Sequence, residues 1–513
     1  MKAFIRSMAF ALSLLMLAAC SPAEKPQDTA EDTTAAAETT TAEETLDPTL
    51  RANHFDAIPA EVKFGGATIT CIFDCDAEAI SGIPQLYIYN DLLGTDNSGD
   101  VLADAVWIRN QNTQDRLDIK LAWKPTGSYE YQVNRTIFQQ LLMAQDNTFD
   151  FILSTGSSLA YVGLGQYMRD LKNMPHVDWE SPWWWQQVNE DLSIDNKTMQ
   201  FVAGDMIMTN LAMSGVTYFN KDMYQDIYGN PEDLYKIVLD GKWTIDKMHT
   251  LAQGAYKDVN GDGAKNEGDR FGLVWSNSHS EVNDLVVNLQ ADLYTRAKDG
   301  KLEIDMDTAR NVQIVEKMTA ILHDEVAVNR RSLSGRNLCT AFSQGASLFN
   351  LSILNFTASV LREMEYEYGI IPNVKLDENQ ERYLTNVPNS GSLLSVPAYL
   401  PDNKFEIVGA ALEVLNGEAH RGYMDTFWEV MMKAKYSRDA QSGQCVDIIM
   451  NGLTKNVLVE YNEYSGQITR HCFCNAAFNQ TSFATAYAAN IEAAKTKWAE
   501  SIAMLTGAAE INK

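Results

Sequence analysis

The chain has 513 residues, of which 45% are hydrophobic and 21% charged, and its formal net charge is −27. This hydrophobic fraction can bury a large core, which excludes a wholly disordered chain. The 68 acidic residues outnumber the 41 basic ones, so a phosphate backbone would be repelled and we expect no nucleic-acid partner. The one long apolar run lies at the extreme N-terminus, which excludes a polytopic membrane protein.

The N-terminus has the layout of a secretion signal. Lys2 and Arg6 precede an apolar stretch over residues 8–16, and small residues follow up to Cys20. The sequence Leu-Ala-Ala-Cys at 17–20 resembles a bacterial lipobox, in which the cysteine is lipidated. We therefore expect a signal peptide over 1–19, lipidation at Cys20, and a protein anchored to the cell membrane on its extracellular or periplasmic side. An ordinary signal peptide with a chance cysteine is the alternative.

Residues 20–60 are expected to form a flexible stalk. The segment is rich in Thr, Ala and Glu and poor in aromatic and branched apolar residues. Such a composition cannot bury enough apolar surface to offset the entropy of ordering, and its acidic charges repel one another. Removal of residues 1–19 would take away two positive charges and change the net charge from −27 to −29.

The first part of the body alternates between strand and helix patterns. Short β-branched or apolar runs predict strands, and apolar residues three or four apart predict helices. The expected strands are 67–73, 117–123 and 149–153, and the expected helices are 100–112 and 131–145. This alternation is typical of a parallel sheet with crossover helices, in which ligands bind beyond the carboxyl ends of the strands.

The remainder of the body continues as α/β. Thr244 is the expected N-cap of a helix that begins near Trp243. Apolar runs predict strands at 216–219, 271–275, 347–351 and 368–371, and helical spacing predicts helices at 309–323, 405–415, 426–434 and 485–504. The six cysteines beyond Cys20 show no zinc-type spacing, and the sequence leaves open whether they are disulfides or buried thiols.

One segment matches a calcium-binding loop. Oxygen-bearing side chains recur along residues 258–269, and Gly263 falls where such a loop turns sharply. The expected Ca²⁺ ligands are Asp258, Asn260, Asp262, Asn266 and Asp269, with the backbone carbonyl of Ala264. Asp269 replaces the usual glutamate, which indicates fewer ligand oxygens or weaker binding. We expect a structural ion, and the alternative is a solvated turn.

Short segments in a characteristic order mark the body of the chain. They are Gly99-Asp100 with Ala105 and Arg109-Asn110, Tyr167 to Leu171 followed by Pro182-Trp183-Trp184, Phe219 to Lys221, Gly241 to Thr244, Phe271 to Leu273, Phe342 to Gly345 with Leu348 to Asn350, and Gly369 to Pro372. In this order they resemble the family 1 extracellular solute-binding proteins of carbohydrate ABC importers, the group related to maltose-binding protein, and the resemblance extends from Gly65 to about Lys497. Asn373 departs from the family pattern.

The resemblance implies a two-lobed, hinge-connected periplasmic-binding-protein-like α/β fold of the class II type. Lobe 1 would comprise 61–210 and 350–398, and lobe 2 would comprise 216–349 and 399–513. Crossovers would lie near 213–215, 349–350 and 395–397. The implied function is a monomeric, non-enzymatic receptor that closes on a small solute, expected to be a carbohydrate, and delivers it to permease subunits.

Sugar recognition needs aromatic rings for stacking and convergent polar groups for hydroxyls. Trp275 is the preferred stacking residue, because it ends an expected strand and polar residues follow it. Trp185 is expected to be freer than Trp183 and Trp184, since three consecutive rings cannot share one helix face; core packing is the alternative for any lone tryptophan, Trp123 above all. The full expected set, aligned to the family pattern, is Asp74, Trp123, Thr155, Gly156, Ser157, Trp185, Ser214, Trp275, Asn277, Ser352 and Asn355.

Three other functions remain open at this stage. A surface glycan hydrolase cannot be dismissed by composition, although no zincin motif, nucleophile elbow or distinct acid/base pair is present. A receptor for a non-sugar solute such as a peptide would share the same fold. An adhesin or sensor module would bind without any permease.

Overall fold

The computed structural model describes residues 47, 49–75, 91–96, 99–195, 198–265, 268–275, 279–298, 300–324, 328–329, 335–357, 360–433 and 440–506. The expected signal peptide, Cys20 and most of the stalk lie outside these residues, as do Asn266 and Asn277. The expected end of the stalk at residue 60 is wrong, because Ile58 is 7% exposed in an apolar cluster with Leu117 and its carbonyl accepts a hydrogen bond from Arg116. Among the described residues, no helix combines the length and the apolar character that crossing a membrane requires.

The first sheet has four strands in the order β12-β3-β1-β2. β1 pairs in parallel with β2 and β3, while β12 runs antiparallel to β3. The strands are β1 (Ala67–Phe73), β2 (Ile119–Pro125), β3 (Phe151–Thr155) and β12 (Ser392–Ser395). β1 lies inside the sheet, and its Ile69, Cys71 and Phe73 are fully buried, whereas Thr68 on the opposite face near the start of the strand is exposed.

Helices α2 and α3 connect the parallel strands of this sheet, as the alternation in the sequence predicted. Asp100 caps α2, and its side chain accepts hydrogen bonds from the amides of Leu102 and Ala103. The helices of this region are α2 (Val101–Leu117), α3 (Tyr131–Met143), α4 (Gly156–Gly163), α5 (Gln186–Asp191) and α6 (Met208–Ala212). β1 matches its expected range, whereas β2 and β3 begin two residues later than expected.

The second sheet has five strands in the order β10-β4-β9-β5-β8. They are β4 (Gly215–Asn220), β5 (Phe271–Val274), β8 (Val328–Asn329), β9 (Ser347–Ile353) and β10 (Tyr368–Ile371). The associated helices are α7 (Lys221–Tyr228), α8 (Glu232–Leu239), α9 (Ile245–Ala255), α10 (His279–Asn288), α11 (Ala309–Leu322) and α12 (Gly335–Ser343). Thr244 caps α9 as expected, with its side chain accepting from the amide of Lys247.

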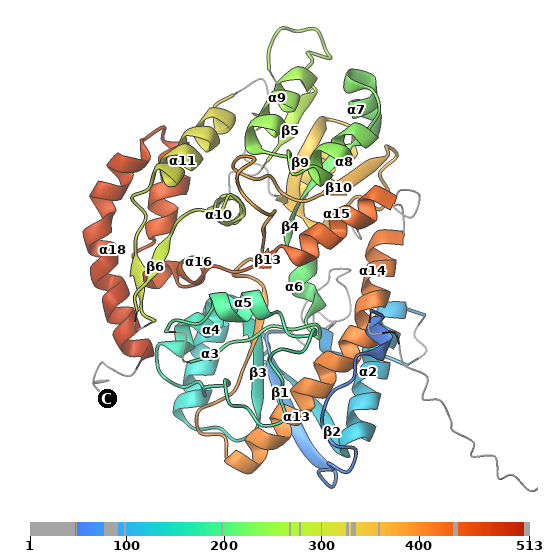
Figure 1. Cartoon of the computed structure of the whole chain (residues 1–513), viewed down its shortest axis with the longest axis vertical. Helices are drawn as coiled ribbons and strands as arrows, with labels where there is room; N and C mark the ends of the chain where they lie inside the picture. The colour runs from blue at the N-terminus through green and yellow to red at the C-terminus, as the bar shows by residue number, and fades with distance from the viewer. Residues whose placement is uncertain are drawn as a thin grey trace, which may run out of the picture. The chain divides into compact units, whose positions relative to one another are not determined.

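Two elements correct the expected lobe boundaries. β10 falls in the range assigned to lobe 1, yet it pairs with β4 in the second sheet. Helix α13 (Asp402–Glu418) falls in the range assigned to lobe 2, yet it packs against α2 (Figure 1). Apolar packing is the reason, because Val414 of α13 and Leu117 of α2 belong to one buried cluster that holds α13 beside the first sheet. One expected crossover, 349–350, lies inside β9 and so is not a junction.

Most of the described chain after α13 is helical. A π-helical turn, η4 (Ala419–Tyr423), leads through α14 (Met424–Lys433) to α15 (Ala440–Asn451), which contacts β10 and α8 of the second sheet. Two short strands, β11 (Thr385–Asn386) and β13 (Leu453–Thr454), pair with each other, as do β6 (Tyr294–Arg296) and β7 (Leu302–Ile304). The final elements are α16 (Val457–Glu460), η6 (Arg470–Asn475), α17 (Ala476–Phe478) and α18 (Phe483–Leu505).

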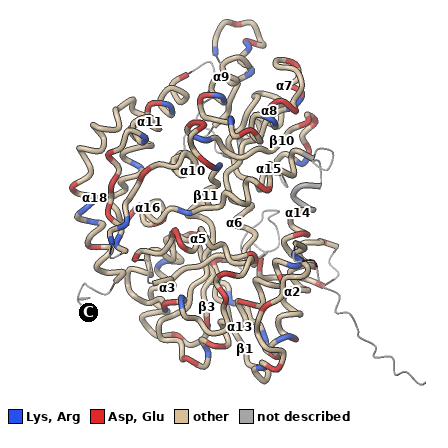
Figure 2. Tube along the Cα trace, in the orientation of Figure 1, with Lys and Arg blue, Asp and Glu red and all other residues tan. Residues whose placement is uncertain are grey.

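The charged side chains of the described residues are mixed in sign. Figure 2 shows Asp and Glu interspersed with Lys and Arg along most elements, with acidic residues the more frequent. Mixed surface charge with an acidic excess favours solubility and gives no basic stripe for a polyanion in the described part of the chain.

Candidate functional site

The structure brings together the predicted residues at the ends of β1 and β3. Asp74 follows β1 and is 3% exposed. Its Oδ2 accepts hydrogen bonds from Ser154 Oγ at 2.7 Å and from the Thr155 amide at 3.1 Å. Burial raises the pKa of Asp74 to about 7, and these hydrogen bonds only partly oppose the rise. Its Oδ1 is buried and has no hydrogen-bond partner among the described residues.

The polar groups at the start of α4 are already used inside the protein. The amides of Gly156 and Ser157 donate to the carbonyls of Gly391 and Asn389, at 2.8 and 3.1 Å. The Ser157 hydroxyl donates to the same Asn389 carbonyl at 3.2 Å. A solute would have to displace the 389–391 segment to reach these donors. The sequence placed Thr155, Gly156 and Ser157 correctly at a strand end but could not show what covers them.

A buried ion pair lies beside the 389–391 segment and fixes the residues that precede it. Lys455 Nζ lies 2.7 Å from Glu460 Oε2, and the two side chains are 1% and 2% exposed. The same ammonium donates to the carbonyls of Val387 and Pro388, at 3.2 and 2.9 Å. Glu460 also lies against Gly156, where a Cβ atom would come within 1.9 Å of its Oε1. A larger residue at 156 would therefore force the Glu460 carboxylate to move from its place beside α4.

A second group of predicted residues lies at the junction between α6 and β4. The Ser214 hydroxyl donates to the carbonyl of Asn210 at 3.0 Å, and the Ser214 carbonyl accepts from the amide of Leu354 at 3.0 Å. Ser352 pairs with Val216 across β9 and β4, and Asn355 follows in a buried turn. All three predicted residues of this group are buried.

The predicted aromatic residues are mostly core residues. Trp275 is 1% exposed at the end of β5, so packing accounts for its position in this structure. Trp123 is half-buried on β2, opposite Cys71. All three neighbouring tryptophans are buried, and Trp185, expected to be the freer one, is 8% exposed against 2% for both Trp183 and Trp184. The three precede α5 in irregular backbone, so their rings need not share a helical face.

Outside the predicted set, a polar cavity of about 550 Å³ lies between α5 and β6. Its volume falls in the range of ligand sites, which is roughly 300–1,000 Å³. Its lining includes the charged, amide and aromatic side chains of Lys172, Gln187, Glu190, Asp191, Tyr294 and Arg296. The two cations and two carboxylates balance in formal charge, and Tyr294 adds a ring. The signal in the sequence was the amide- and acid-rich run Gln186 to Asp191 directly after the three tryptophans.

Hydrogen bonds from distant segments fix the walls of this cavity. Asp191 accepts from Gln187 Nε2 at 2.8 Å, Thr454 Oγ1 at 2.6 Å and the Lys455 amide at 3.2 Å. Burial raises the pKa of Asp191, and these hydrogen bonds oppose the rise. On the other side, Arg296 Nη2 donates to the carbonyl of Ser193 at 2.6 Å. Walls that are fixed before binding reduce the entropy lost when a ligand is ordered.

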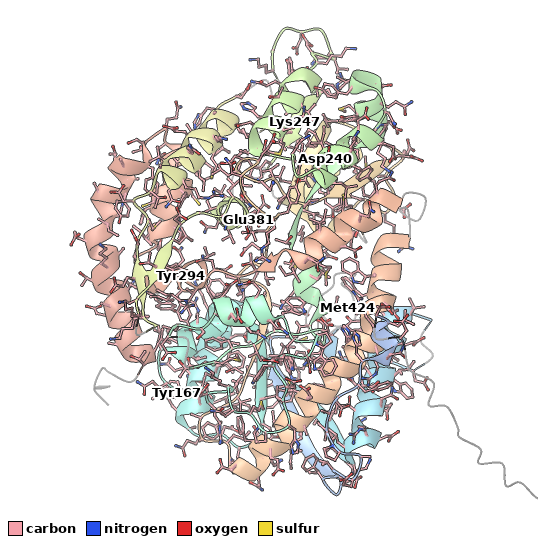
Figure 3. All side chains as sticks on the ribbon, in the orientation of Figure 1. Tyr167, Asp240, Lys247, Tyr294, Glu381 and Met424 are labelled. Carbon is pink, nitrogen blue, oxygen red and sulfur yellow. The ribbon has the colours of Figure 1, made fainter. Side chains whose placement is uncertain are left out.

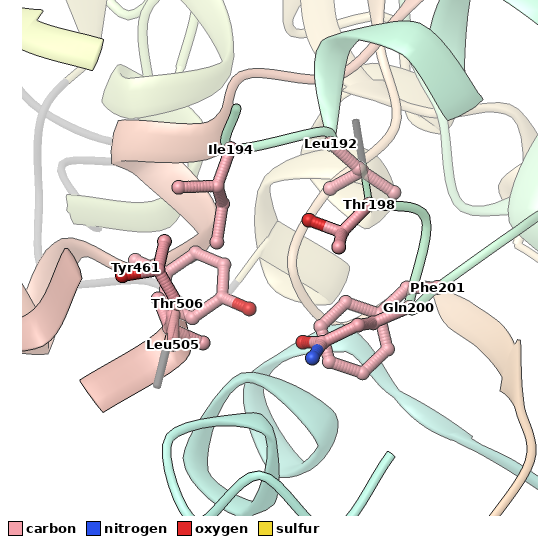
Figure 4. A pocket seen from close by; sticks show the side chains of 8 residues that line it. All are labelled: Leu192, Ile194, Thr198, Gln200, Phe201, Tyr461, Leu505 and Thr506. Carbon is pink, nitrogen blue, oxygen red and sulfur yellow. The ribbon is translucent and has the colours of Figure 1, made fainter. Parts of the chain in front are cut away.

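A small enclosed space adjoins the polar cavity (Figure 4). It measures about 10 Å³, which is close to the minimum for one water molecule. Thr198 lines both spaces, and the Tyr461 hydroxyl points into the smaller one toward Gln200. That hydroxyl is buried without a hydrogen-bond partner among the described residues, so a water molecule there would satisfy it.

The predicted calcium loop joins α9 to β5. Asp258 accepts from the amides of Gly261 at 2.6 Å and Gly263 at 3.0 Å, and Asp262 accepts from the amide of Ala264 at 2.7 Å. Asp269 is buried and accepts from the Tyr256 hydroxyl at 3.2 Å. No group of three or more His, Cys, Asp or Glu side chains within the described ranges could hold a metal ion. The loop is folded as an acidic turn, and calcium binding stays a prediction.

Replacing Asp74 with asparagine is expected to change stability in a pH-dependent way. The pKa of Asp74 is about 7 in the folded protein and about 4 in the unfolded chain, so the buried carboxylate lowers stability increasingly from pH 4 to 7. Asp74→Asn should therefore raise Tm at pH 8 by at least about 2 °C, and by much less at pH 4.5. Calorimetry at both pH values measures this. Asp226→Asn, at an exposed position on α7, is the control, and an equal change at both pH values would contradict the assignment.

No family model matches the chain, and no curated protein matches it. Solved structures do match. A cyclic α-maltosyl-1,6-maltose binding protein from Arthrobacter globiformis aligns with 86% of this chain and 100% of its own, at 13% identity and a TM-score of 0.55. A family 1 extracellular solute-binding protein from Bifidobacterium longum subsp. infantis aligns with 85% of this chain and 100% of its own, at 13% identity and a TM-score of 0.52.

A third match is UgpB from Mycobacterium tuberculosis, solved in complex with glycerophosphocholine. It aligns with 78% of this chain and 95% of its own, at 12% identity and a TM-score of 0.52. At sequence identities this low, the structural alignments establish a shared architecture but do not identify the ligand of this chain. The protein therefore has the two-lobed α/β fold of the extracellular solute-binding proteins.

Proposed function

We propose that the protein is a solute-binding receptor that captures a sugar or oligosaccharide and delivers it to the permease of an ABC importer. The observation that carries the proposal is the two-sheet fold. It aligns with 100% of the cyclic α-maltosyl-1,6-maltose binding protein and with 98% of a galacto-N-biose/lacto-N-biose I-binding protein of an ABC transporter from Bifidobacterium longum. The expected signal and stalk further support a receptor held at the outer face of a membrane.

The polar cavity beside α5 is the proposed solute site. Lys172, Glu190 and Asp191 supply donors and acceptors for hydroxyl groups, and the ring of Tyr294 can stack on a sugar face. The balanced charge favours a neutral solute over an ion. Asp74, Thr155, Gly156 and Ser157 remain candidates for a solute that displaces the 389–391 segment.

Binding in this cavity would couple the two lobes. Glu190 and Asp191 belong to α5 beside the first sheet, whereas Tyr294 and Arg296 lie on β6, which follows α10 of the second lobe. A solute that contacts both sides favours the arrangement in which they lie close together. The same contacts stabilise the folded protein by mass action, and the solute leaves unchanged.

A phosphorylated or zwitterionic solute is the second candidate, because UgpB with bound glycerophosphocholine shares the fold. A net anionic solute would need uncompensated positive charge in its site, whereas a zwitterion carries both signs of charge and is compatible with a balanced site. The two cations and two carboxylates of the α5 cavity offer equal numbers of each sign.

A thermal-shift and calorimetric screen tests the carbohydrate assignment. At least one mono-, di- or oligosaccharide should raise Tm by several degrees, because a ligand at 100 times its Kd adds about 2.7 kcal/mol of stability. Tyr294→Ala should weaken binding of that sugar by about tenfold or more, through the lost ring contact. Tyr366→Ala, at an exposed tyrosine outside the cavity, is the matched control. Stabilisation by peptides or glycerophosphocholine and by no sugar would overturn the assignment.

The lipid anchor is proposed at Cys20, where the sequence resembles a lipobox. Cys20→Ser should move the protein from the membrane fraction to the soluble fraction when it is expressed in a bacterium that processes lipoproteins. Lys25→Ala, five residues further along the stalk, should stay with the membrane. Equal partitioning of Cys20→Ser and the unchanged protein would contradict the anchor.

Calcium is proposed as a structural ion in the 258–269 loop, on the strength of its sequence pattern. Addition of Ca²⁺ after treatment with chelator should raise Tm by several degrees, and Asp262→Ala should abolish the rise. Asp226→Ala, at an exposed carboxylate on α7, should keep the calcium response. If chelator leaves Tm unchanged and Asp262→Ala has no effect on Tm, the loop is only a turn.

A further inference from the structure

A second cavity lies on the other side of α5 from the polar cavity. It measures about 250 Å³ and is lined by Trp185, Met424, Met450 and Leu453, with Arg51 and Asp205. Gln187 lines both cavities, so the two meet at the exposed side of this short helix. Figure 3 labels Tyr294 in the first cavity and Met424 in the second, and α5 lies between them.

The sizes of the two cavities favour a shared occupant. At 250 Å³ the second cavity is below the usual range for a separate ligand site, whereas the two together offer about 800 Å³. The second cavity also balances one cation, Arg51, against one carboxylate, Asp205. Each cavity contains one ring of the kind that stacks on a sugar, Tyr294 in the first and Trp185 in the second.

The side chains of the second cavity are held in fixed positions. Trp185 Nε1 donates to Asp205 Oδ1 at 2.8 Å, and Asp205 Oδ2 lies 2.6 Å from His420 Nδ1. Trp185 is thus fixed with its ring against the cavity, and its polar edge is already satisfied. Because the indole N–H is already hydrogen-bonded and the ring is held in place, little side-chain entropy is lost when a ligand packs against the ring.

Gln187 is placed to contact a ligand that passes from one cavity to the other. Its Nε2 donates to Asp191 at 2.8 Å, and its Oε1 accepts from Arg382 Nη2 at 3.4 Å. An amide has two donor hydrogens and two acceptor lone pairs, so each end of Gln187 retains capacity for one further hydrogen bond. Arg382 also donates to the carbonyl of Asn451, which ties the dividing side chain to the end of α15.

We propose that the solute is an extended, unbranched oligosaccharide that lies along α5, with one end against Tyr294, the other end against Trp185, and Gln187 hydrogen-bonded to the unit between them. This inference rests on the proposed function, and it adds a ligand length and a second set of contacts. A monosaccharide or disaccharide would fill only one cavity. Affinity therefore rises with chain length until both cavities are occupied.

The test is a chain-length series measured by titration calorimetry on the whole mature protein. The probes are glucose and the linear α-1,4-linked oligomers from maltose to maltohexaose, with β-1,4-linked gluco- and xylo-oligomers in parallel. We expect affinity to rise at least tenfold between the disaccharide and the pentamer of one series. Met450→Trp, which fills the second cavity from α15, should remove this gain. Gln187→Ala, at an exposed position that does not threaten folding, should reduce it.

Met143→Trp is the matched control, because Met143 is 63% exposed on α3 and lines neither cavity. It should keep the full gain with length. If a disaccharide binds but longer oligomers bind no more tightly, or if the gain survives both Met450→Trp and Gln187→Ala, the extended site is wrong and the proposed receptor function stands. If no sugar of any length binds, the proposed carbohydrate ligand fails and this inference fails with it.

Discussion

The buried ion pair between Lys455 and Glu460 organises the region where the two sheets' connections meet. An ammonium and a carboxylate removed from water are tolerated only when they are paired and their remaining hydrogen-bonding capacity is satisfied. Lys455 meets this demand by also donating to the carbonyls of Val387 and Pro388, which fixes the crossover segment before β12. Glu460 meets it only in part, because its Oε2 is paired with Lys455 whereas its Oε1, beside Gly156, has no hydrogen-bond partner among the described residues. One pair thus joins three segments that are far apart in sequence.

This arrangement covers the start of α4 and leaves polar space elsewhere, along α5. The crossover carbonyls of Asn389 and Gly391 accept the first amides of α4, so the carboxyl ends of β1 and β3 are covered by the protein itself. Lys455 also donates its amide to Asp191, which holds the end of α5 in register with β13. The accessible polar space consequently lies along α5, where side chains from both lobes meet without forming a closed core.

The space along α5 has a consistent chemical character. Cations and carboxylates are equal in number in both cavities, and the half-buried Asp191 and the buried Asp205 are already hydrogen-bonded. A neutral ligand with many hydroxyl groups adds no net charge to such a site and can use its mixed donors and acceptors. The strongly negative net charge of the whole chain therefore says little about the ligand, because the charge is balanced locally where binding is proposed.

The sequence by itself determined the fold class and most of the elements. The β-branched run Ala67–Phe73 and the apolar run Tyr368–Ile371 are strands with the expected limits, because β-branched and apolar side chains favour a largely buried strand. Helix starts depend on local residues too, since the side chains of Asp100 and Thr244 accept hydrogen bonds from amides in the first turns of α2 and α9. The order of family-like segments predicted the two-lobed fold, which the solved structures share.

Only the tertiary structure decided which sheet each element joins and which polar groups stay accessible. β10 pairs with β4 and α13 packs on α2, because strand pairing and apolar contact depend on partners remote in sequence. The burial of the tryptophans could not be predicted for the same reason. The sequence shows that Trp185 and Trp275 carry large rings, but whether a ring is buried depends on the residues that pack around it. Likewise, the sequence marked Asp74 and Ser157 as strand-end residues, whereas only the fold brings the carbonyls of Asn389 and Gly391 onto the amides of Ser157 and Gly156 and leaves a cavity beside α5.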